Sequence, residues 1–441
     1  MKTKFIKRVW LLLLSVGPGI FCIGYTIGTG SVTSMAKAGS EFGTQLLWVL
    51  VISVLFAWLL MEAYGRYAVV TGGTAIHSIR KKIKYGNILA IFIVTGVVIG
   101  QWNSLSGILG LSANAIYELI QLFFPGAVSG NYWVVLGIAI FLIVTLYGLL
   151  LVGKYSFFEK ILIVFVTFMG VSFLISMFIV LPDPSEIVAG LKPSIPKAPG
   201  GKLMVAAFVG TTMAAPTFVV RPLLMKGKGW GKEHTKEQSK DALISAILMF
   251  IISASILLTA TGALFHEGKV IHKVLDMVST LEPVAGKFAV AIFVIGTLSA
   301  GLSSIFPILM VAPLLIADYK NGEFDTNSKQ FKILTGIAAL FGLVIPIIGA
   351  NPIVAQIATQ VANVFVLPLV IGAIAYLVNN KKDMGSQKAG IVLNIGLLSA
   401  FAFSCFIAYN GIIALTELFR ADKISYYETF FNSCLIIINY C

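Results

Sequence analysis

Hydroxyl groups and helix-breaking residues occur together at two points in otherwise apolar stretches of the chain. At the first point Gly28 and Gly30 weaken the helical pattern, and at the second Pro216 removes a backbone hydrogen bond. Unwound backbone in an apolar environment is stable only where protein or a water-filled cavity satisfies its polar groups. Both points are therefore predicted to bind a small solute through hydroxyl groups and free backbone atoms. The candidate binding residues there are Gly28, Thr29, Gly30, Ser31, Thr211, Thr212, Ala214 and Thr217.

Catalytic chemistry has no comparable support in the sequence. An enzyme needs a nucleophile with a base, or a cluster of metal ligands. The four histidines fall in predicted loops or at their edges, and the four cysteines lack the spacing of a metal site. The sequence thus predicts no enzyme, no catalytic residue, no metal centre and no resident cofactor. The residues concerned are His77, His234, His266, His272, Cys22, Cys405, Cys434 and Cys441.

The elements that must position the candidate binding residues are apolar helices. Of the 441 residues, 58% are hydrophobic and only 12% are charged, whereas soluble domains have about 45–50% and 25%. Apolar segments of about 20 residues recur between short polar breaks, and each is long enough to cross the hydrocarbon core as a helix. We therefore predict an all-α polytopic membrane protein whose partners are the lipid bilayer and a small inorganic solute.

Eleven spans are expected, as two sets of five followed by one extra helix. The two interrupted segments open the two sets, as in transporters built from inverted repeats. The predicted organisation is one transmembrane domain over 1–441, with repeat one at 11–181, repeat two at 202–378, the extra helix at 389–416 and an interfacial tail at 417–441. The expected spans lie near residues 11–37, 45–65, 86–112, 131–153, 158–181, 202–224, 241–265, 288–316, 333–350, 353–378 and 389–416.

The formal net charge of +13 is explained by membrane topology. If the N-terminus is cytoplasmic, most Lys and Arg residues fall in loops on the cytoplasmic side, as the positive-inside rule requires. The basic loops include 80–84, 226–240 and 381–388, and the opposite loops at 182–201 and 266–287 carry fewer basic residues. We predict a protein of the cell (inner) membrane with a cytoplasmic N-terminus, an external C-terminus and no nucleic-acid partner.

The chain resembles the NRAMP family of divalent-metal transporters. The residues that match the family's first spans without a gap are Gly17-Pro18-Gly19, Phe42-Gly43, Leu46-Leu47-Trp48-Val49 and the spacing from Arg66 to Gly72. A second similar patch surrounds Gln356 and Leu367-Pro368-Leu369. The resemblance covers most of the chain. It implies the LeuT-type fold of two inverted five-helix repeats, with spans 1 and 6 unwound in mid-membrane and an eleventh helix appended.

The metal-binding residues of that family do not carry over in this register. The family's metal-binding Asp falls on Gly28, its Asn on Ser31 and its metal-binding Met on Ala214. The family's glutamine of the tenth span is matched by Gln356 or Gln360, which makes Gln356 a further candidate binding residue. A transition metal needs a carboxylate, imidazole or sulfur donor. The resemblance therefore implies that the chain keeps the family's fold, whereas its binding site lacks the donors that a metal needs.

A small anion is the expected solute, with bicarbonate as the specific candidate. The second half of each broken span offers free N–H groups and a positive dipole end, and no acidic residue of the central spans offsets them. Arg221 adds positive charge if it faces the pathway; otherwise it anchors its helix at the cytoplasmic end. The alternatives are a divalent metal ion (Mg²⁺ or Mn²⁺), a channel-like permease, or breaks that serve only packing.

Secondary active transport by symport is the expected mechanism. A proton relay in the membrane uses Asp, Glu or His, which the central spans lack, whereas Na⁺ needs only carbonyl and hydroxyl oxygens. Na⁺ is therefore preferred as the coupling ion, with Thr33, Ser299 and Ser303 as its candidate ligands. The sequence leaves the stoichiometry and the oligomeric state open.

Overall fold

The structure is a computed structural model that describes residues 18–124, 132–152, 155–272, 276, 282–320 and 327–421. Every regular element in these residues is a helix, and ten stretches are long and apolar enough to span a membrane. One stretch, Thr29–Thr71, contains two expected spans, because the 3-10 turn η1 (Gly43–Leu46) joins α3 (Thr29–Phe42) to α4 (Leu47–Thr71). The chain is thus an all-helical, multi-pass membrane protein.

The helices after α4 coincide with the apolar runs of the sequence. The main ones are α6 (Gly86–Phe123), α7 (Tyr132–Val152), α8 (Tyr155–Ile179), α10 (Gly201–Thr212), α11 (Ala215–Gly227), α12 (Thr235–Leu264), α14 (Glu282–Lys320), α15 (Lys329–Gly342), α17 (Pro352–Asn363), α18 (Leu367–Asn379) and α20 (Ile391–Ala421). The short ones are α5 (Ala75–Lys82), α9 (Pro184–Ala189), η2 (Lys232–His234), η3 (Phe265–Glu267), α16 (Val344–Ile348), α19 (Lys381–Met384) and η4 (Gly385–Gln387). α6 extends beyond its expected end at residue 112, because the next residues are rich in good helix formers such as Ala, Leu and Glu.

Two helices are interrupted where the sequence predicts. Two residues, Ile27 and Gly28, separate the end of α2 (Pro18–Thr26) from the start of α3. α10 and α11 are separated in the same way by Met213 and Ala214. The second interruption ends before Pro216 because a proline in the first turn of a helix has no intrahelical N–H bond to lose.

The sequence pattern misses a third interruption. The expected span at 353–378 is two helices, because α17 ends at Asn363 and α18 begins at Leu367. Pro368 stands in the first turn of α18, where its fixed φ suits a helix start. A proline therefore accompanies this break too, but it lies after the break, in the helix that follows.

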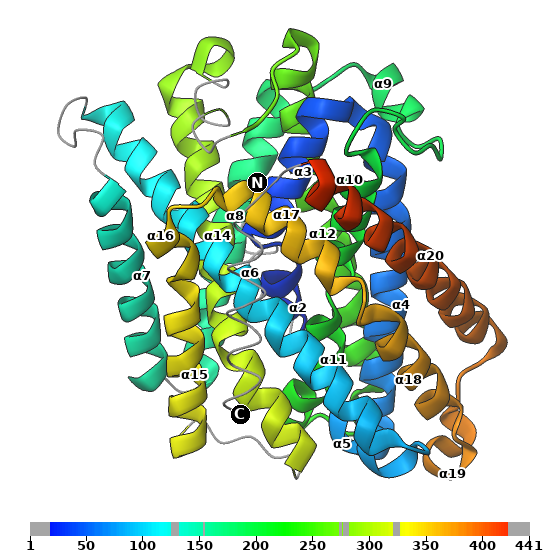
Figure 1. The fold of residues 1–441 in the computed structure, drawn as a ribbon. Coiled ribbons are helices and arrows are strands. Elements are labelled where there is room, and N and C mark those ends of the chain that lie inside the picture. The colour runs from blue at the N-terminus through cyan, green and yellow to red at the C-terminus, as the bar shows by residue number, and fades with distance from the viewer. Residues whose placement is uncertain are drawn as a thin grey trace, which may run out of the picture.

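The interrupted helix pair α10–α11 lies at the centre of the bundle. In the most apolar 18-residue segment of this pair 94% of the residues are buried. In the corresponding segments of α7 and α20 only 28% are buried. α7 and α20 lie at opposite edges of the bundle, and α2 lies near its middle (Figure 1). The pair α10–α11 is therefore the most protected of the candidate spans, and the outer helices present their apolar side chains to lipid.

The two ends of the predicted organisation lie outside the described residues. These are the start of the first expected span, 11–17, and the part of the predicted interfacial tail beyond Ala421. The extra helix expected at 389–416 is α20, which continues to Ala421.

Candidate functional site

A small cavity lies where the two helix interruptions meet α6, α14 and α17. Its volume is about 10 Å³, which is room for about one water molecule. Among the described residues, no Asp, Glu, Lys, Arg or His lines it. The lining residues are Tyr25, Gly28, Gly30, Gln101, Ser104, Ile108, Thr211, Ala214, Ser304, Ile308, Gln360 and Asn363. Of the predicted binding residues, four line the cavity (Gly28, Gly30, Thr211 and Ala214) and six do not (Thr29, Ser31, Thr212, Thr217, Gln356 and Arg221).

Glycine leaves room for neighbouring side chains at both lining positions of the first interruption. A Cβ atom on Gly28 would lie 2.9 Å from Cβ of Ser304 and closer still to its hydroxyl. A Cβ atom on Gly30 would overlap the amide of Gln360 and lie 3.0 Å from Oε1 of Gln356. The two glycines thus let the polar side chains of α14 and α17 approach the start of α3.

Hydroxyl groups tie the two interruptions together. The Ser31 hydroxyl donates to the Thr26 carbonyl oxygen at 2.5 Å and lies 2.6 Å from Oγ1 of Thr211. Thr211 Oγ1 also donates to the Thr26 carbonyl, at 3.3 Å. This carbonyl stands at the end of α2, where no intrahelical donor is available. The predicted residues Ser31 and Thr211 therefore close the C-terminal end of α2.

Two predicted hydroxyls are fully buried but make no hydrogen bond. Oγ1 of Thr29 and Oγ1 of Thr212 have no partner within the described part of the chain. Thr217, in contrast, pairs through Oγ1 with Oγ1 of Thr26 at 3.3 Å. A buried hydroxyl without a partner costs about 1–3 kcal/mol. Thr29 and Thr212 are thus unpaired buried hydroxyls that adjoin the cavity-lining residues Gly28, Gly30 and Thr211 in the sequence.

A chain of side-chain amides forms the opposite wall, and the sequence pattern identified only part of it. Gln101 donates to Asn363, Asn363 to Gln360, and Gln360 to Gln356, over distances from 3.2 to 3.5 Å. Gln356 itself turns away and donates to the Ser104 carbonyl at 2.6 Å. The spacing 356, 360 and 363 puts three amides on one face of a helix, and that spacing was the available signal.

The predicted coupling-ion residues are only partly brought together. Thr33 donates to the Thr29 carbonyl at 2.6 Å and Ser303 to the Ala300 carbonyl at 3.0 Å, each within its own helix. Ser299 is buried in α14. Ser304, the next residue of α14, donates across helices to the Gly24 carbonyl at 2.6 Å. The contact between α14 and the end of α2 therefore runs through Ser304.

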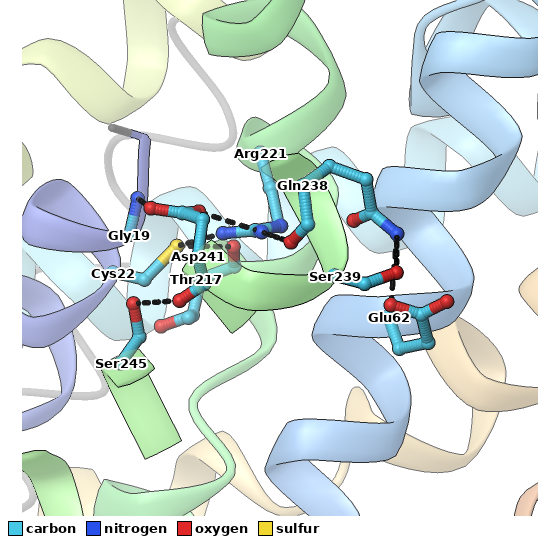
Figure 2. Close-up of polar contacts among 9 residues, drawn as sticks. All are labelled: Gly19, Cys22, Glu62, Thr217, Arg221, Gln238, Ser239, Asp241 and Ser245. Atoms are coloured by element: carbon cyan, nitrogen blue, oxygen red, sulfur yellow. Dashed lines mark hydrogen bonds and ion pairs between the residues drawn. The ribbon is translucent and has the colours of Figure 1, made fainter. Parts of the chain in front are cut away.

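Arg221 does not face the cavity. Its guanidinium pairs with the Asp241 carboxylate (Figure 2), at a distance of 2.7 Å. Both side chains are completely buried. The alternative, in which Arg221 only anchors its helix at the cytoplasmic end, is also incomplete, because the charge of Arg221 is paired with Asp241 inside the bundle. The expectation that the central spans lack acidic groups is wrong here, since Asp241, Glu62 and Asp318 are all buried. The sequence placed Asp241 at the edge of a span, where contact with water is normal.

The backbone dipoles at the two interruptions do not add up to a positive site. α3 and α11 begin there with the positive ends of their dipoles, but α2 and α10 end there with the negative ends of theirs. The expected unopposed positive potential is therefore absent. The cavity is a neutral site with both donors and acceptors.

The sequence matches a known family along most of its length. The family model described as "Natural resistance-associated macrophage protein-like" matches residues 19–414. The chain belongs to this family. Two relatives named "Divalent metal cation transporter MntH" are 23% identical over 413 residues (Verminephrobacter eiseniae; 92% of this chain, 90% of the relative) and 22% identical over 387 residues (Bacillus subtilis; 85% and 86%).

Solved structures of other proteins have a fold similar to that of this Nramp-family chain. A manganese transporter of Eremococcus coleocola superposes with a TM-score of 0.72 at 17% identity, covering 97% of this chain and 91% of that chain. MhsT in complex with L-phenylalanine gives 0.60 at 14% identity, covering 90% and 98%. The protein is thus a multi-pass membrane transporter of the Nramp family and not an enzyme.

Proposed function

We propose that this protein is a secondary transporter of a divalent cation, Mg²⁺ or Mn²⁺, which it binds weakly in the neutral cavity between the two helix interruptions. The observation that carries the proposal is the lining of that cavity by hydroxyl and amide oxygens, in a chain whose relatives are named divalent metal cation transporters. Hard oxygen donors suit these ions. This choice replaces the small anion as the first candidate.

Weak and unselective binding is expected from the donor types. Preference for Mn²⁺ over Mg²⁺ usually comes from softer nitrogen or sulfur ligands. Met213 lies in the second interruption, but it does not line the cavity. We therefore expect similar affinities for Mg²⁺ and Mn²⁺, at about 1 mM or weaker.

A small anion such as bicarbonate is the second candidate, and one observation favours it. No carboxylate of the described residues lines the cavity, so a cation gains no direct charge compensation there. The support for an anion is weaker than the sequence alone implies, because the charge of Arg221 is paired with Asp241. Charge-assisted bonds from N–H groups of α3 and α11 would then hold the anion.

The proposed architecture is the inverted repeat, with 11–181 and 202–378 as its halves and a cytoplasmic N-terminus. Its support is the matching position of the two interruptions at the start of each half and the bias of basic residues among the loops. Na⁺ is the proposed coupling ion, with hydroxyls of Ser303 and Ser304 and the carbonyl of Gly24 as its ligands; its support is the contact of Ser304 with Gly24. The buried Asp241, Glu62 and Asp318 make protons the alternative. A Na⁺ gradient that drives uptake in the presence of a protonophore supports this, whereas loss of uptake with the protonophore alone assigns the coupling to protons.

Uptake into proteoliposomes tests the solute directly. Purified protein is assayed with Mg²⁺, Mn²⁺ and bicarbonate separately, with protein-free liposomes as the control. Saturable uptake of either divalent cation supports the proposal. Bicarbonate uptake without cation uptake makes the anion the transported species, and linear uptake of all three is the behaviour of a channel-like permease.

A further inference from the structure

The first half of α6 has an exposed face that is mostly apolar. Ile88, Phe92 and Ile99 expose 55%, 65% and 38% of their surface. Together with Thr95, which is also exposed, these residues recur every three or four positions and so lie on one face of the helix. On a membrane-spanning helix, such a face contacts the acyl chains of the lipid.

This face begins at a strained turn between α5 and α6. Tyr85 has φ of 58° and ψ of 20°, and it is the only residue other than glycine with a positive φ in the described part of the chain. A bulky side chain rarely adopts this conformation. The turn is tight because Gly86 approaches the backbone of Ile79 so closely that a Cβ atom would collide with its carbonyl oxygen. The Tyr85 side chain therefore projects outward, with 72% of its surface exposed.

Two exposed lysines flank the ring of Tyr85 in the sequence. Lys84 places its Nζ atom 5.3 Å from the centre of that ring, and Lys81 lies one helical turn earlier, at the end of α5. Within the described residues, neither lysine forms an ion pair. The first acidic residue after α5 is Glu118, near the other end of α6. The corner formed by Lys81, Lys84 and Tyr85 thus carries positive charge that no acid of α5 or of the start of α6 offsets.

The other two basic residues of this segment already have partners. Arg80 donates to the Tyr319 carbonyl at 2.6 Å and lies over the ring of the same residue. Lys82 pairs with Asp383 of α19 at 3.0 Å. These contacts fix α5 to its neighbours, and they leave Lys81 and Lys84 as the charges available to a ligand.

We propose that this corner binds the headgroup of an anionic phospholipid. Lys81 and Lys84 contact the phosphate, Tyr85 lies at the level of the headgroup, and an acyl chain follows Ile88 and Phe92 along α6. Basic residues next to a membrane span attract anionic headgroups, and tyrosine is enriched at the membrane surface. The positive-inside rule accounts for lysines in a loop, but it does not require a strained, exposed tyrosine between them and a lipid-facing stripe. The proposal concerns a lipid partner and is independent of the ion that is transported.

A fluorophore on the stripe measures which lipid occupies the site. Bimane is attached to Ile88→Cys, in a background with Cys405, Cys434 and Cys441 replaced by serine; Cys22 stays because it is completely buried. The protein is reconstituted into phosphatidylcholine vesicles that contain either brominated phosphatidylglycerol or brominated phosphatidylcholine, and quenching gives the relative binding constant of the two lipids. We expect a preference for phosphatidylglycerol of about tenfold at this position. At Phe141→Cys on α7, an exposed position of a helix without charged residues, we expect no preference.

Two pairs of substitutions test the lysines. Lys81→Gln/Lys84→Gln should remove the preference at Ile88→Cys. The matched control, Lys236→Gln/Lys240→Gln, removes the same charge from exposed positions at the start of α12 and should leave the preference unchanged. Equal loss in both pairs would show a general attraction between the protein and anionic lipid, and it would overturn the proposal. Equal quenching by the two lipids at Ile88→Cys in the presence of all four lysines would overturn it as well.

Discussion

Restoring a carboxylate at Gly28 should convert the neutral cavity into a tighter divalent-cation site. A side chain there would collide with Ser304, whose Cβ lies 2.9 Å from the position of the new Cβ. The variant must therefore combine Gly28→Asp with Ser304→Gly, which removes both colliding atoms. The backbone poses no obstacle, because Gly28 has φ of −99°.

The size of the effect can be worked out from the charges. A unit charge attracts a divalent ion at about 4 Å by about 2 kcal/mol even at the dielectric constant of water, and by more in a buried site. Each 1.4 kcal/mol is a factor of ten in affinity, so we expect Mn²⁺ and Mg²⁺ to bind at least about 30-fold more tightly. Glycine within α14 costs about 1 kcal/mol of stability, and Ser304→Gly alone is therefore the control.

Isothermal titration calorimetry of the purified protein in detergent measures both affinities. We expect a dissociation constant of about 1 mM or weaker for the wild type and tens of micromolar for the double variant. Micromolar Mn²⁺ binding by the wild type, or no tightening in the double variant, would refute the reasoning. The same variant should abolish bicarbonate uptake if the anion is the true substrate.

Three further predictions concern the surrounding structure. Ser31→Ala should lower the free energy of unfolding by about 1 kcal/mol, because it removes a short hydrogen bond to the end of α2; thermal unfolding in detergent measures this. Asp318→Asn should cost about 1–2 kcal/mol in the same assay, since the carboxylate accepts from the backbone N–H groups of Ile76 and His77 at the start of α5; an unchanged melting temperature would contradict its capping role. Burial, together with the charges of Lys81 and other basic residues, lowers the pKa of His77 below its usual 6.5. The unfolded chain then binds this proton first, so stability should fall as the pH drops below about 6.5, and His77→Gln should reduce that slope.

The amino-acid pattern predicts most of the fold, because membrane helices are specified by local properties. Apolar runs mark the helices, and Gly28 and Pro216 mark two interruptions. The third interruption carries no breaker in its own residues, Val364 to Val366. Only Pro368 beyond it gives a hint. A helix end that depends on a proline further along the chain is difficult to recognise from composition.

The site was harder to predict than the fold, because its polar groups meet through tertiary contacts. Arg221 was treated as an isolated charge, since Asp241 is twenty positions away in the sequence and belongs to another helix. The pairing removes the electrostatic support that an isolated Arg221 gives to an anion. Gln101 and Asn363 meet in the amide chain for the same reason, from α6 and α17. Spacing along one helix identifies a polar face, but it does not identify the partner of that face.

The central claim is that the protein transports a divalent cation, which binds in the cavity between the helix interruptions. Uptake of Mg²⁺ and Mn²⁺ into proteoliposomes, with wild type and Gly210→Leu compared, tests it most directly. A side chain at Gly210 would overlap the Gln360 carbonyl and push α17 away from the cavity. We expect saturable uptake of both ions by the wild type and little by the variant, with equal amounts of folded protein in the two preparations. Bicarbonate uptake by the wild type without uptake of either cation would contradict the claim.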